Sequence, residues 1–344
     1  MAQRLASLTS ISLDRALARL VEDAATAIGR LDARITASPV AAAWRLRAAW
    51  TGYAHALQLQ GHEIDEIDVF AFGCGIQVPG RAHLTTVYDP FEQFEPWRRQ
   101  LVDRPAQHWR EGIGAAVDPD PNYAGPRLIR ALEALRQISL GDPSIEAWLA
   151  LPVLLARMGI TQTPLPCLVS GEKRLRFAQA ADPALLRRLL RALAEHATTG
   201  LARLDALEHD RNLAVKSIAA SARQASLTRL AAQLQFKPVT SPQGLSSEFG
   251  ITIAGAGKLL SRAEAAGLVK EVRGTQAWKL YLTPDLAVSF SLAPPARGRP
   301  RGNPPPLSSD TKLAASLDAF DREMAQLIDR YPDLAIATEI EADK

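Results

Sequence analysis

Apolar residues recur at helical spacing along most of this 344-residue chain. Between residues 12 and 34 they form a single stripe, which predicts an amphipathic helix. Ser38 and Pro39 have the arrangement of an N-cap followed by proline at the first helical position, and predict a second helix that ends near Gly61. The same spacing predicts further helices over residues 64–72, 127–138, 144–158 and 183–221.

Prolines interrupt the helical pattern between residues 81 and 126. Trp97 and Trp109 are expected to anchor this irregular segment to the helical core. The F-G-C-G-I sequence that begins at Phe72 is expected to end a helix rather than to hold a phosphate, because the third glycine of a dinucleotide-binding fingerprint is missing.

Residues 227–282 carry the most specific pattern in the chain. Two helical segments are separated by Gly250, which supplies the left-handed residue that a helix end requires. Thr252 is the expected N-cap of the second segment, whose apolar residues repeat at helical spacing until Gly267. The sequence therefore predicts three helices, of which the last two are joined by a tight turn.

Beyond this point the pattern changes to two short β-rich runs, residues 268–273 and 278–282, joined by a Gly-Thr-Gln turn. With the sequences L-S-S-E-F-G-I-T, K-L-L and A-A-G-L-V, this order resembles the winged helix-turn-helix family, and the resemblance implies DNA binding. The alternative is a small helical subdomain with a hairpin that serves only in dimerisation. The expected fold is mainly α: a helical domain over residues 1–222, a winged helix-turn-helix with a β-hairpin wing over 223–290, a basic linker over 291–308, and a C-terminal helix with an acidic tail over 309–344.

The charge of the chain is unevenly distributed. Residues 211–301 carry 13 Lys and Arg against 4 Asp and Glu, whereas the preceding residues carry 23 against 24 and the following residues 4 against 9. The positive charge therefore lies on the predicted winged helix-turn-helix, and double-stranded DNA is the expected partner. A solvated basic surface without a partner is the alternative.

Other function classes find little support in the sequence. There is no apolar run long enough to cross a membrane and no N-terminal signal segment, and Cys74 and Cys167 form no disulfide framework, so a cytoplasmic location is expected. The six histidines are scattered, and the G-A-G-K sequence over 255–258 lacks both the first glycine and the hydroxyl residue of a phosphate loop. No catalytic residue, cofactor or metal site is predicted.

Direct base recognition by the predicted module is expected to be limited. Residues 253–257, which open the last of its three helices, include no Arg, Asn or Gln for paired hydrogen bonds to a base. The hairpin charges are either contacts to the DNA backbone or ordinary exposed charges. The candidate DNA contacts are Thr252, Lys258, Ser261 and Arg262 on the helix, and Arg273 and Lys279 on the hairpin.

The P-P-A-R-G-R-P-R sequence over residues 294–301 resembles the AT-hook, a peptide that lies along the minor groove of AT-rich DNA. Gly298 would let the backbone approach the floor of the groove, and Arg297, Arg299 and Arg301 would direct positive charge towards it. A charged, proline-rich linker of no particular affinity is the alternative.

A homodimer is also expected, because pairing two half-sites strengthens a module with few base contacts. Packing within one subunit is the alternative for each candidate interface. These candidates are the leucines of the predicted 183–221 helix, Leu185, Leu189, Leu193 and Leu204, and the C-terminal apolar residues Leu313, Leu317, Phe320, Met324 and Leu327.

The W-R-L-R sequence over 44–47 and the L-Q-G-H-E-I-D sequence over 59–65, taken with the C-terminal module, resemble a group of bacterial, often plasmid-borne proteins. Members of this group pair a helical domain of unknown function with a helix-turn-helix. The module also resembles the C-terminal part of Fic-type proteins, but Asp89 replaces the histidine of their His-Pro-Phe motif, so their catalysis is not implied. The expected function is DNA binding in transcription or plasmid maintenance; a non-enzymatic interaction or effector-binding scaffold is the alternative.

Overall fold

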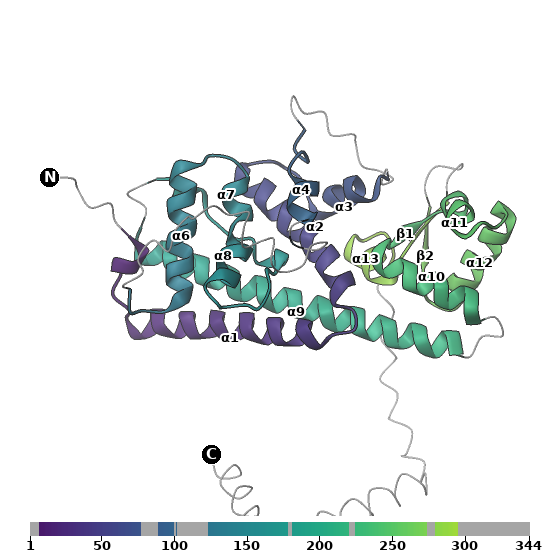
Figure 1. The fold of residues 1–344 in the computed structure, drawn as a ribbon, viewed down its shortest axis with the longest axis horizontal. Helices are drawn as coiled ribbons and strands as arrows, with labels where there is room; N and C mark the ends of the chain where they lie inside the picture. The colour runs from purple at the N-terminus through teal and green to yellow at the C-terminus, as the bar shows by residue number, and fades with distance from the viewer. Residues whose placement is uncertain are drawn as a thin grey trace, which may run out of the picture. The chain divides into compact units, whose positions relative to one another are not determined.

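A computed structural model describes residues 7–76, 89–99, 101, 123–177, 181–219, 224–273 and 279–294. These residues form a mainly helical structure, as the sequence predicts, with a small antiparallel sheet of three strands where the sequence predicts two (Figure 1). Of the predicted 291–308 linker, residues 291–294 are described, and Leu292 and Ala293 pack against the hydrophobic core of the body. The rest of the predicted linker, the predicted C-terminal helix and Trp109 lie outside the described residues.

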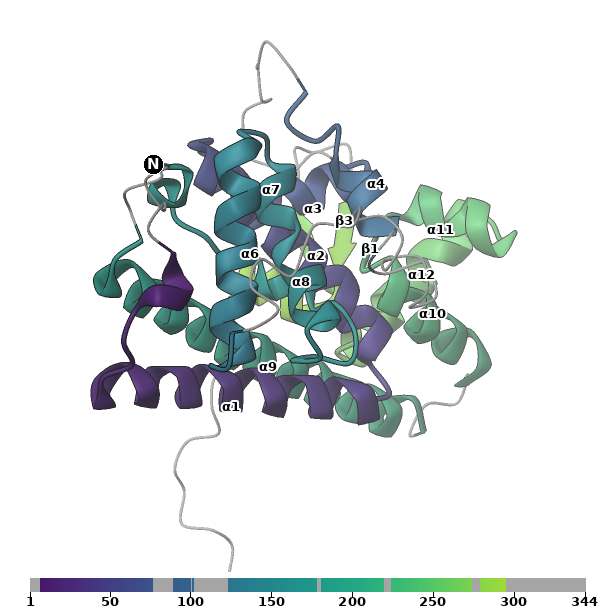
Figure 2. The ribbon, with the colours of Figure 1, turned by 60° about the vertical axis from the view of Figure 1, so that its left-hand side comes forward.

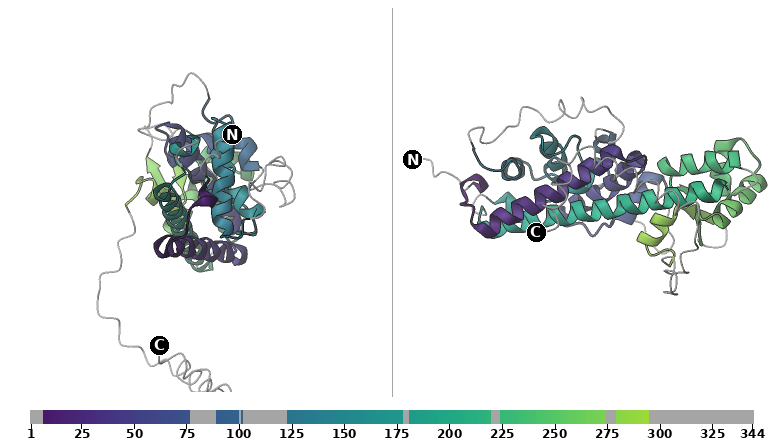
Figure 3. Two further views of the ribbon diagram at one scale, coloured as in Figure 1. Left: turned by 90° about the vertical axis from the view of Figure 1, so that its left-hand side faces the viewer. Right: turned by 90° about the horizontal axis from the view of Figure 1, so that it is seen from below.

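Two long helices, α1 (Arg15–Ala37) and α9 (Pro183–Ala219), run side by side along one edge of the structure (Figures 1 and 3). Each is predicted, and each begins at an aspartate: the Asp14 carboxylate accepts a hydrogen bond from the Leu17 amide at 2.7 Å, and Asp182 accepts one from Leu185 at 2.6 Å. Their facing leucines and isoleucines are buried, so the amphipathic stripes become part of the core.

Helix α2 (Ala41–Gln60) is enclosed by the other helices of the body, and the Trp44, Trp50 and Tyr53 side chains on it are almost fully buried. It ends at Gly61, which has the expected left-handed conformation (φ 98°). The prediction that Ser38 caps this helix is wrong, because the helix begins two residues later, after Val40. The Ser38 hydroxyl instead donates to Glu208 of α9 and accepts from the Val40 amide, in the turn before the helix.

Helix α3 (Glu66–Cys74) ends at Gly75 (φ 61°), which confirms that the F-G-C-G sequence stops a helix. After the gap, α4 (Phe94–Arg98) places the buried Trp97 against the body, where its indole nitrogen donates to the Leu149 carbonyl at 3.2 Å. The expected anchoring role of Trp97 is therefore confirmed.

Three helices form the side of the body seen in front in Figure 2: α6 (Arg127–Gly141), α7 (Glu146–Leu149) and α8 (Leu151–Arg157). The single helix predicted over 144–158 is broken at Ala150, close to Pro152, a residue without an amide hydrogen for the helical bond. The short 3-10 helices are η1 (Leu8–Ser10), η3 (Pro166–Leu168) and η4 (Lys173–Arg176).

The C-terminal module, residues 224–282, has three helices and a sheet. Its strands lie in the order β1-β3-β2, with Val239 opposite Leu282 and Lys270 also opposite Leu282 on the other side. The first strand has two residues and is not predicted from the sequence. The elements are α10 (Gln224–Phe236), β1 (Val239–Thr240), α11 (Pro242–Phe249), α12 (Ile253–Ala265), β2 (Lys270–Arg273) and β3 (Lys279–Leu282), followed by α13 (Pro284–Ser289).

Two hydrophobic clusters hold these parts together. One lies inside the module, between its three helices, and also takes in Ile218 from the end of α9. The other fills the helical body and includes Val239, Val272 and Leu282 from the sheet and Leu286 from α13. The body and the module therefore share apolar cores, and the described residues up to Ala293 belong to one compact unit.

Candidate nucleic-acid interface

The turn between α11 and α12 has the geometry that the sequence predicts. Gly250 is left-handed (φ 64°), and the Thr252 hydroxyl accepts a hydrogen bond from the Gly255 amide at 3.1 Å. The Ser246 hydroxyl closes the turn by donating to the Ile251 carbonyl at 2.6 Å. Thr252 thus acts as a helix cap and fixes the start of α12.

A hollow on the surface of the module lies between α10 and α12 and includes three of the predicted contacts, Lys258, Ser261 and Arg262. Lys258 and Arg262 lie one turn apart on α12, and the Arg262 Nε donates to the Lys258 carbonyl at 3.4 Å. Arg229 of α10, which is not among the predicted contacts, lines the same hollow with its guanidinium 4.3 Å from the centre of the Phe249 ring. We call Arg229, Lys258 and Arg262 the basic surface.

The carboxylates of the module are all engaged elsewhere. Its three acidic residues are Glu248, Glu264 and Glu271. Glu248 accepts hydrogen bonds from Gln233 and Lys237, Glu264 accepts one from the Glu271 amide, and Glu271 pairs with Lys279. Within the described part of the chain, Arg229, Lys258 and Arg262 make no ion pair. The basic surface consequently presents positive charge that no nearby carboxylate neutralises.

Apolar side chains border the basic surface. Ile253, at the first position of α12, is 59% exposed, and Ile251 in the turn is 37% exposed. Gly255 and Gly257 lie on the hollowed side of the same helix, where the absence of side chains leaves its backbone open to close approach. The exposed start of α12 can therefore make apolar and backbone contacts, whereas its cations lie further along.

The hairpin candidates differ from those on α12. Lys279 lies opposite Arg273 in the sheet and forms an ion pair with Glu271 at 3.2 Å. The same carboxylate accepts a hydrogen bond from the Tyr281 hydroxyl, and burial together with this carboxylate raises the pKa of Tyr281 to about 12. The Arg273 side chain lies outside the described residues, and so do Arg297, Gly298, Arg299 and Arg301.

No protein-family model matches this chain, and a comparison with curated proteins finds no similar sequence. The assignment of the module to the winged helix-turn-helix family and the resemblance to bacterial, plasmid-borne proteins accordingly stay predictions.

The helical body brings together two histidines that are far apart in the sequence. The His55 and His196 rings stack with their centroids 4.4 Å apart, and the His196 Nδ1 shares a hydrogen bond with the Ser170 hydroxyl at 2.8 Å. Burial lowers the pKa of both rings, that of His196 to about 4, so both are neutral near pH 7. Within the described residues, no group of three His, Cys, Asp or Glu side chains is arranged to hold a metal ion.

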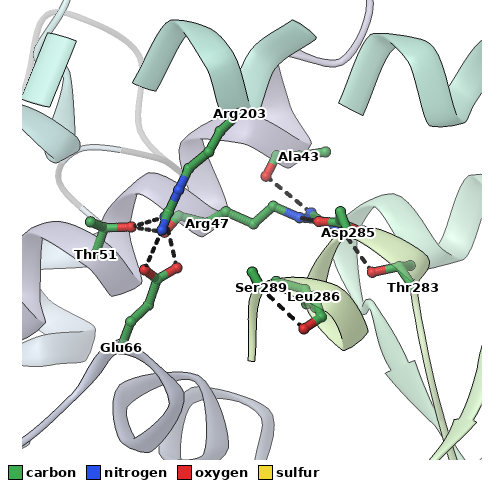
Figure 4. A network of polar contacts seen from close by, with 9 residues as sticks. All are labelled: Ala43, Arg47, Thr51, Glu66, Arg203, Thr283, Asp285, Leu286 and Ser289. Carbon is green, nitrogen blue, oxygen red and sulfur yellow. Dashed lines mark hydrogen bonds and ion pairs between the residues drawn. The ribbon is translucent and has the colours of Figure 1, made fainter. Parts of the chain in front are cut away.

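An ion-pair network, drawn in Figure 4, lines one hollow together with the two histidines. Arg203 of α9 donates to both carboxylate oxygens of Glu66, each at 2.8 Å, and to the Thr51 hydroxyl at 2.5 Å. Burial raises the pKa of the nearby Cys167 thiol to about 12, which keeps it protonated. These groups are neutralised or paired, so they add structural contacts to the body.

The α9 leucines proposed as a dimer contact are Leu185, Leu189, Leu193 and Leu204, and each is at most 1% exposed. These leucines pack inside the chain, because α1 and α9 turn their apolar faces towards each other. For this set, packing within one subunit therefore replaces the expected dimer contact. The second set of candidates, Leu313 to Leu327, lies outside the described residues. Among the helices that are described, none is both long enough and apolar enough to cross a membrane.

Proposed function

We propose that the C-terminal module is a winged helix-turn-helix and that the protein binds double-stranded DNA, as a regulator of transcription or plasmid maintenance. Support comes from the order of elements, in which two helices joined by a three-residue turn precede the β2–β3 hairpin. In a winged helix-turn-helix, the second of the two helices joined by the turn enters the major groove, and the hairpin lies against the neighbouring DNA backbone. Here that helix is α12.

The observation that carries this proposal is the basic surface without carboxylate partners. Lys258 and Arg262 are one turn apart on α12, and Arg229 approaches from α10, so three cations surround one hollow. Cations that contact phosphates supply affinity and fix orientation but do not read the base sequence. Glu248 and Glu271, which would repel phosphates if they were free, are already paired.

In this proposal, the exposed start of α12 contacts the bases. Its first side chain, Ile253, is apolar, and an apolar side chain in the major groove can contact the C5-methyl group of thymine. A preference for thymine-containing sites agrees with the AT-hook-like residues 294–301, which are expected to contact the minor groove of AT-rich DNA.

The proposal is tested by fluorescence anisotropy of a labelled AT-rich duplex with the full chain and its Lys258→Ala variant. The loss of one phosphate contact should weaken binding to all sequences alike and reduce the salt slope by about one. Lys270→Ala is the matched control, because it removes the same charge from the module at an exposed position that does not line the hollow. The proposal is wrong if the full chain does not bind duplex DNA, or if both variants bind equally well.

A second experiment replaces the thymines of the duplex by uracils, which removes only the C5-methyl groups. The full chain should bind the thymine duplex more tightly than the uracil duplex, by a few-fold, whereas Ile253→Ala should bind both equally. Equal binding of the two duplexes by the full chain would show that Ile253 does not read thymine, while leaving DNA binding itself intact.

A second candidate function is a scaffold whose module contacts a protein. The exposed Ile251 and Ile253 favour it, because apolar side chains exposed side by side are typical of protein-binding surfaces. Under this proposal Ile253→Asp abolishes the protein contact, and the full chain shows no salt-dependent binding to duplex DNA. A homodimer that places two modules on two half-sites stays a proposal for either function.

A further inference from the structure

A second hollow, of about 240 Å³, lies between the helical body and the C-terminal module. It is bounded by α2 and α9 on one side, by α10 and the turn after α12 on the other, and by the start of α13. Most of its wall is apolar and includes the buried side chains of Leu207 and Ile218 from α9, Leu234 from α10, and Leu268. A volume of 240 Å³ corresponds to roughly eight water molecules at ~30 Å³ each, which is room for a ligand of about nine non-hydrogen atoms.

One end of the hollow is charged. Arg47 of α2 forms a buried ion pair with Asp285 of α13, with 2.5 Å between Nε and Oδ2, and also donates to the Thr283 hydroxyl at 3.3 Å (Figure 4). Asp210 of α9 lines the same hollow, so two carboxylates face it. The hydrogen bonds of Arg47 go to Asp285, to Thr283 and to the Ala43 carbonyl, the last at 3.2 Å, and none goes to Asp210. The nearby charges of His209 and Arg47 only partly offset the burial of the Asp210 carboxylate.

Asp210 is half-buried and makes no hydrogen bond or ion pair with any residue that the structure describes. Burial, followed by the negative charge of Asp285, raises its pKa, as expected for a carboxylate that lacks a partner. Arg211 also lines the hollow, but its side chain is exposed, and adjacent residues of a helix do not face each other. The charged end therefore carries one carboxylate more than its buried cation neutralises.

We propose that this hollow is a binding site for a small organic amine, with the ammonium group against the Asp210 carboxylate and the hydrocarbon part against the apolar wall. The ammonium group supplies the positive charge that Asp210 lacks, and the apolar wall excludes strongly hydrated inorganic cations. Neutral amphipathic molecules lack the charge, and organic anions would be repelled by the Asp210 carboxylate. The site does not depend on whether the protein binds DNA.

The test is isothermal titration calorimetry of the full chain near pH 7.5 with 2-phenylethylamine, and with 2-phenylethanol as the uncharged molecule of the same shape. The amine should bind at least about tenfold more tightly than the alcohol, because only the amine makes a charge-assisted hydrogen bond. Asp210→Asn should remove this difference while keeping the shape of the side chain.

Two further variants separate the site from general effects. Asp205→Asn removes a negative charge from α9 at a position that pairs with Arg34 and does not line the hollow, so amine binding should be unchanged. Ala214→Leu places a larger side chain in the hollow and should abolish binding while leaving Asp210 in place. The proposal is overturned if the amine does not bind at millimolar concentration, if amine and alcohol bind equally, or if Asp210→Asn binds the amine as well as the unchanged chain does.

Discussion

Two glycines in helix interiors differ sharply in their surroundings. A Cβ atom added to Gly52 of α2 would lie 2.1 Å from the Pro166 carbonyl oxygen, whereas one added to Gly29 of α1 meets nothing within 4 Å. The absence of a side chain at Gly52 therefore lets α2 pack directly against the backbone of η3.

Alanine substitution should consequently have opposite effects at the two positions. Gly29→Ala should stabilise the protein by about 0.5–1 kcal/mol through helix propensity, and Gly52→Ala should destabilise it by about 3 kcal/mol or more because the two backbones must separate. Urea unfolding followed by circular dichroism measures both. Similar midpoints for the two variants would show that the contact at Gly52 is not tight.

Single residues with a local role were the most predictable from sequence. Thr252, Gly61 and Gly250 have the predicted cap or turn conformations, because these depend on a few neighbouring residues. Roles that depend on tertiary contacts were missed. Arg229 could have been suspected, since it points away from the apolar stripe of α10, but the lone carboxylate of Asp210 is defined by residues on four other elements.

The short helix α13 is joined to α2 by the buried Arg47–Asp285 ion pair, whose side chains are 6% and 12% exposed. Removing one partner of a buried pair leaves an unpaired charge, so Arg47→Ala should destabilise the protein by about 3–5 kcal/mol. The double variant Arg47→Met/Asp285→Leu should recover most of this loss, because no charge then stays buried.

The measurement is the midpoint of urea unfolding for the single and double variants, with Arg34→Ala as a control. Arg34 forms ion pairs that are largely exposed, so its replacement should leave the midpoint nearly unchanged. A double variant as unstable as Arg47→Ala would mean that the packing of α13, rather than the charge, dominates.

The long helices and both hairpin strands are predicted from the sequence, whereas the two-residue strand β1 is not, for a physical reason. The predicted 12–34 and 183–221 helices correspond to α1 and α9, because many turns repeat the apolar spacing. Strand β1 has two residues and no periodicity, and it exists because β3 supplies its hydrogen-bond partner. The break at Ala150 within the predicted 144–158 helix was missed although Pro152 marks it.

At the scale of the whole molecule, the His55–His196 stack predicts a pH dependence. The folded protein holds His196 neutral with a pKa of about 4, whereas the unfolded chain has the ordinary value of 6.5. The unfolded state therefore binds more protons between these values. Stability should be greatest above pH 6.5 and fall by about 2–3 kcal/mol as the pH is lowered towards 4.

Urea unfolding at pH 7 and pH 5 measures this effect, and His196→Gln should flatten the difference between the two. Equal stability of the unaltered protein at pH 7 and pH 5 would show that the stack tolerates a proton.

Helix α9 contributes to both hydrophobic clusters, through Leu207 in the body and Ile218 in the module. Eleven residues separate these two, which at ~100° per residue is three turns and about 20°, so one face of the helix reaches both clusters. Inserting a single residue between them would rotate Ile218 by about 100°, and inserting seven would nearly restore its direction but displace it by about 10 Å. The length of α9 between Leu207 and Ile218 therefore fixes both the distance between the two hydrophobic clusters and the direction in which Ile218 points. Any natural variation in the length of the chain should fall in the connecting loops rather than between these two residues.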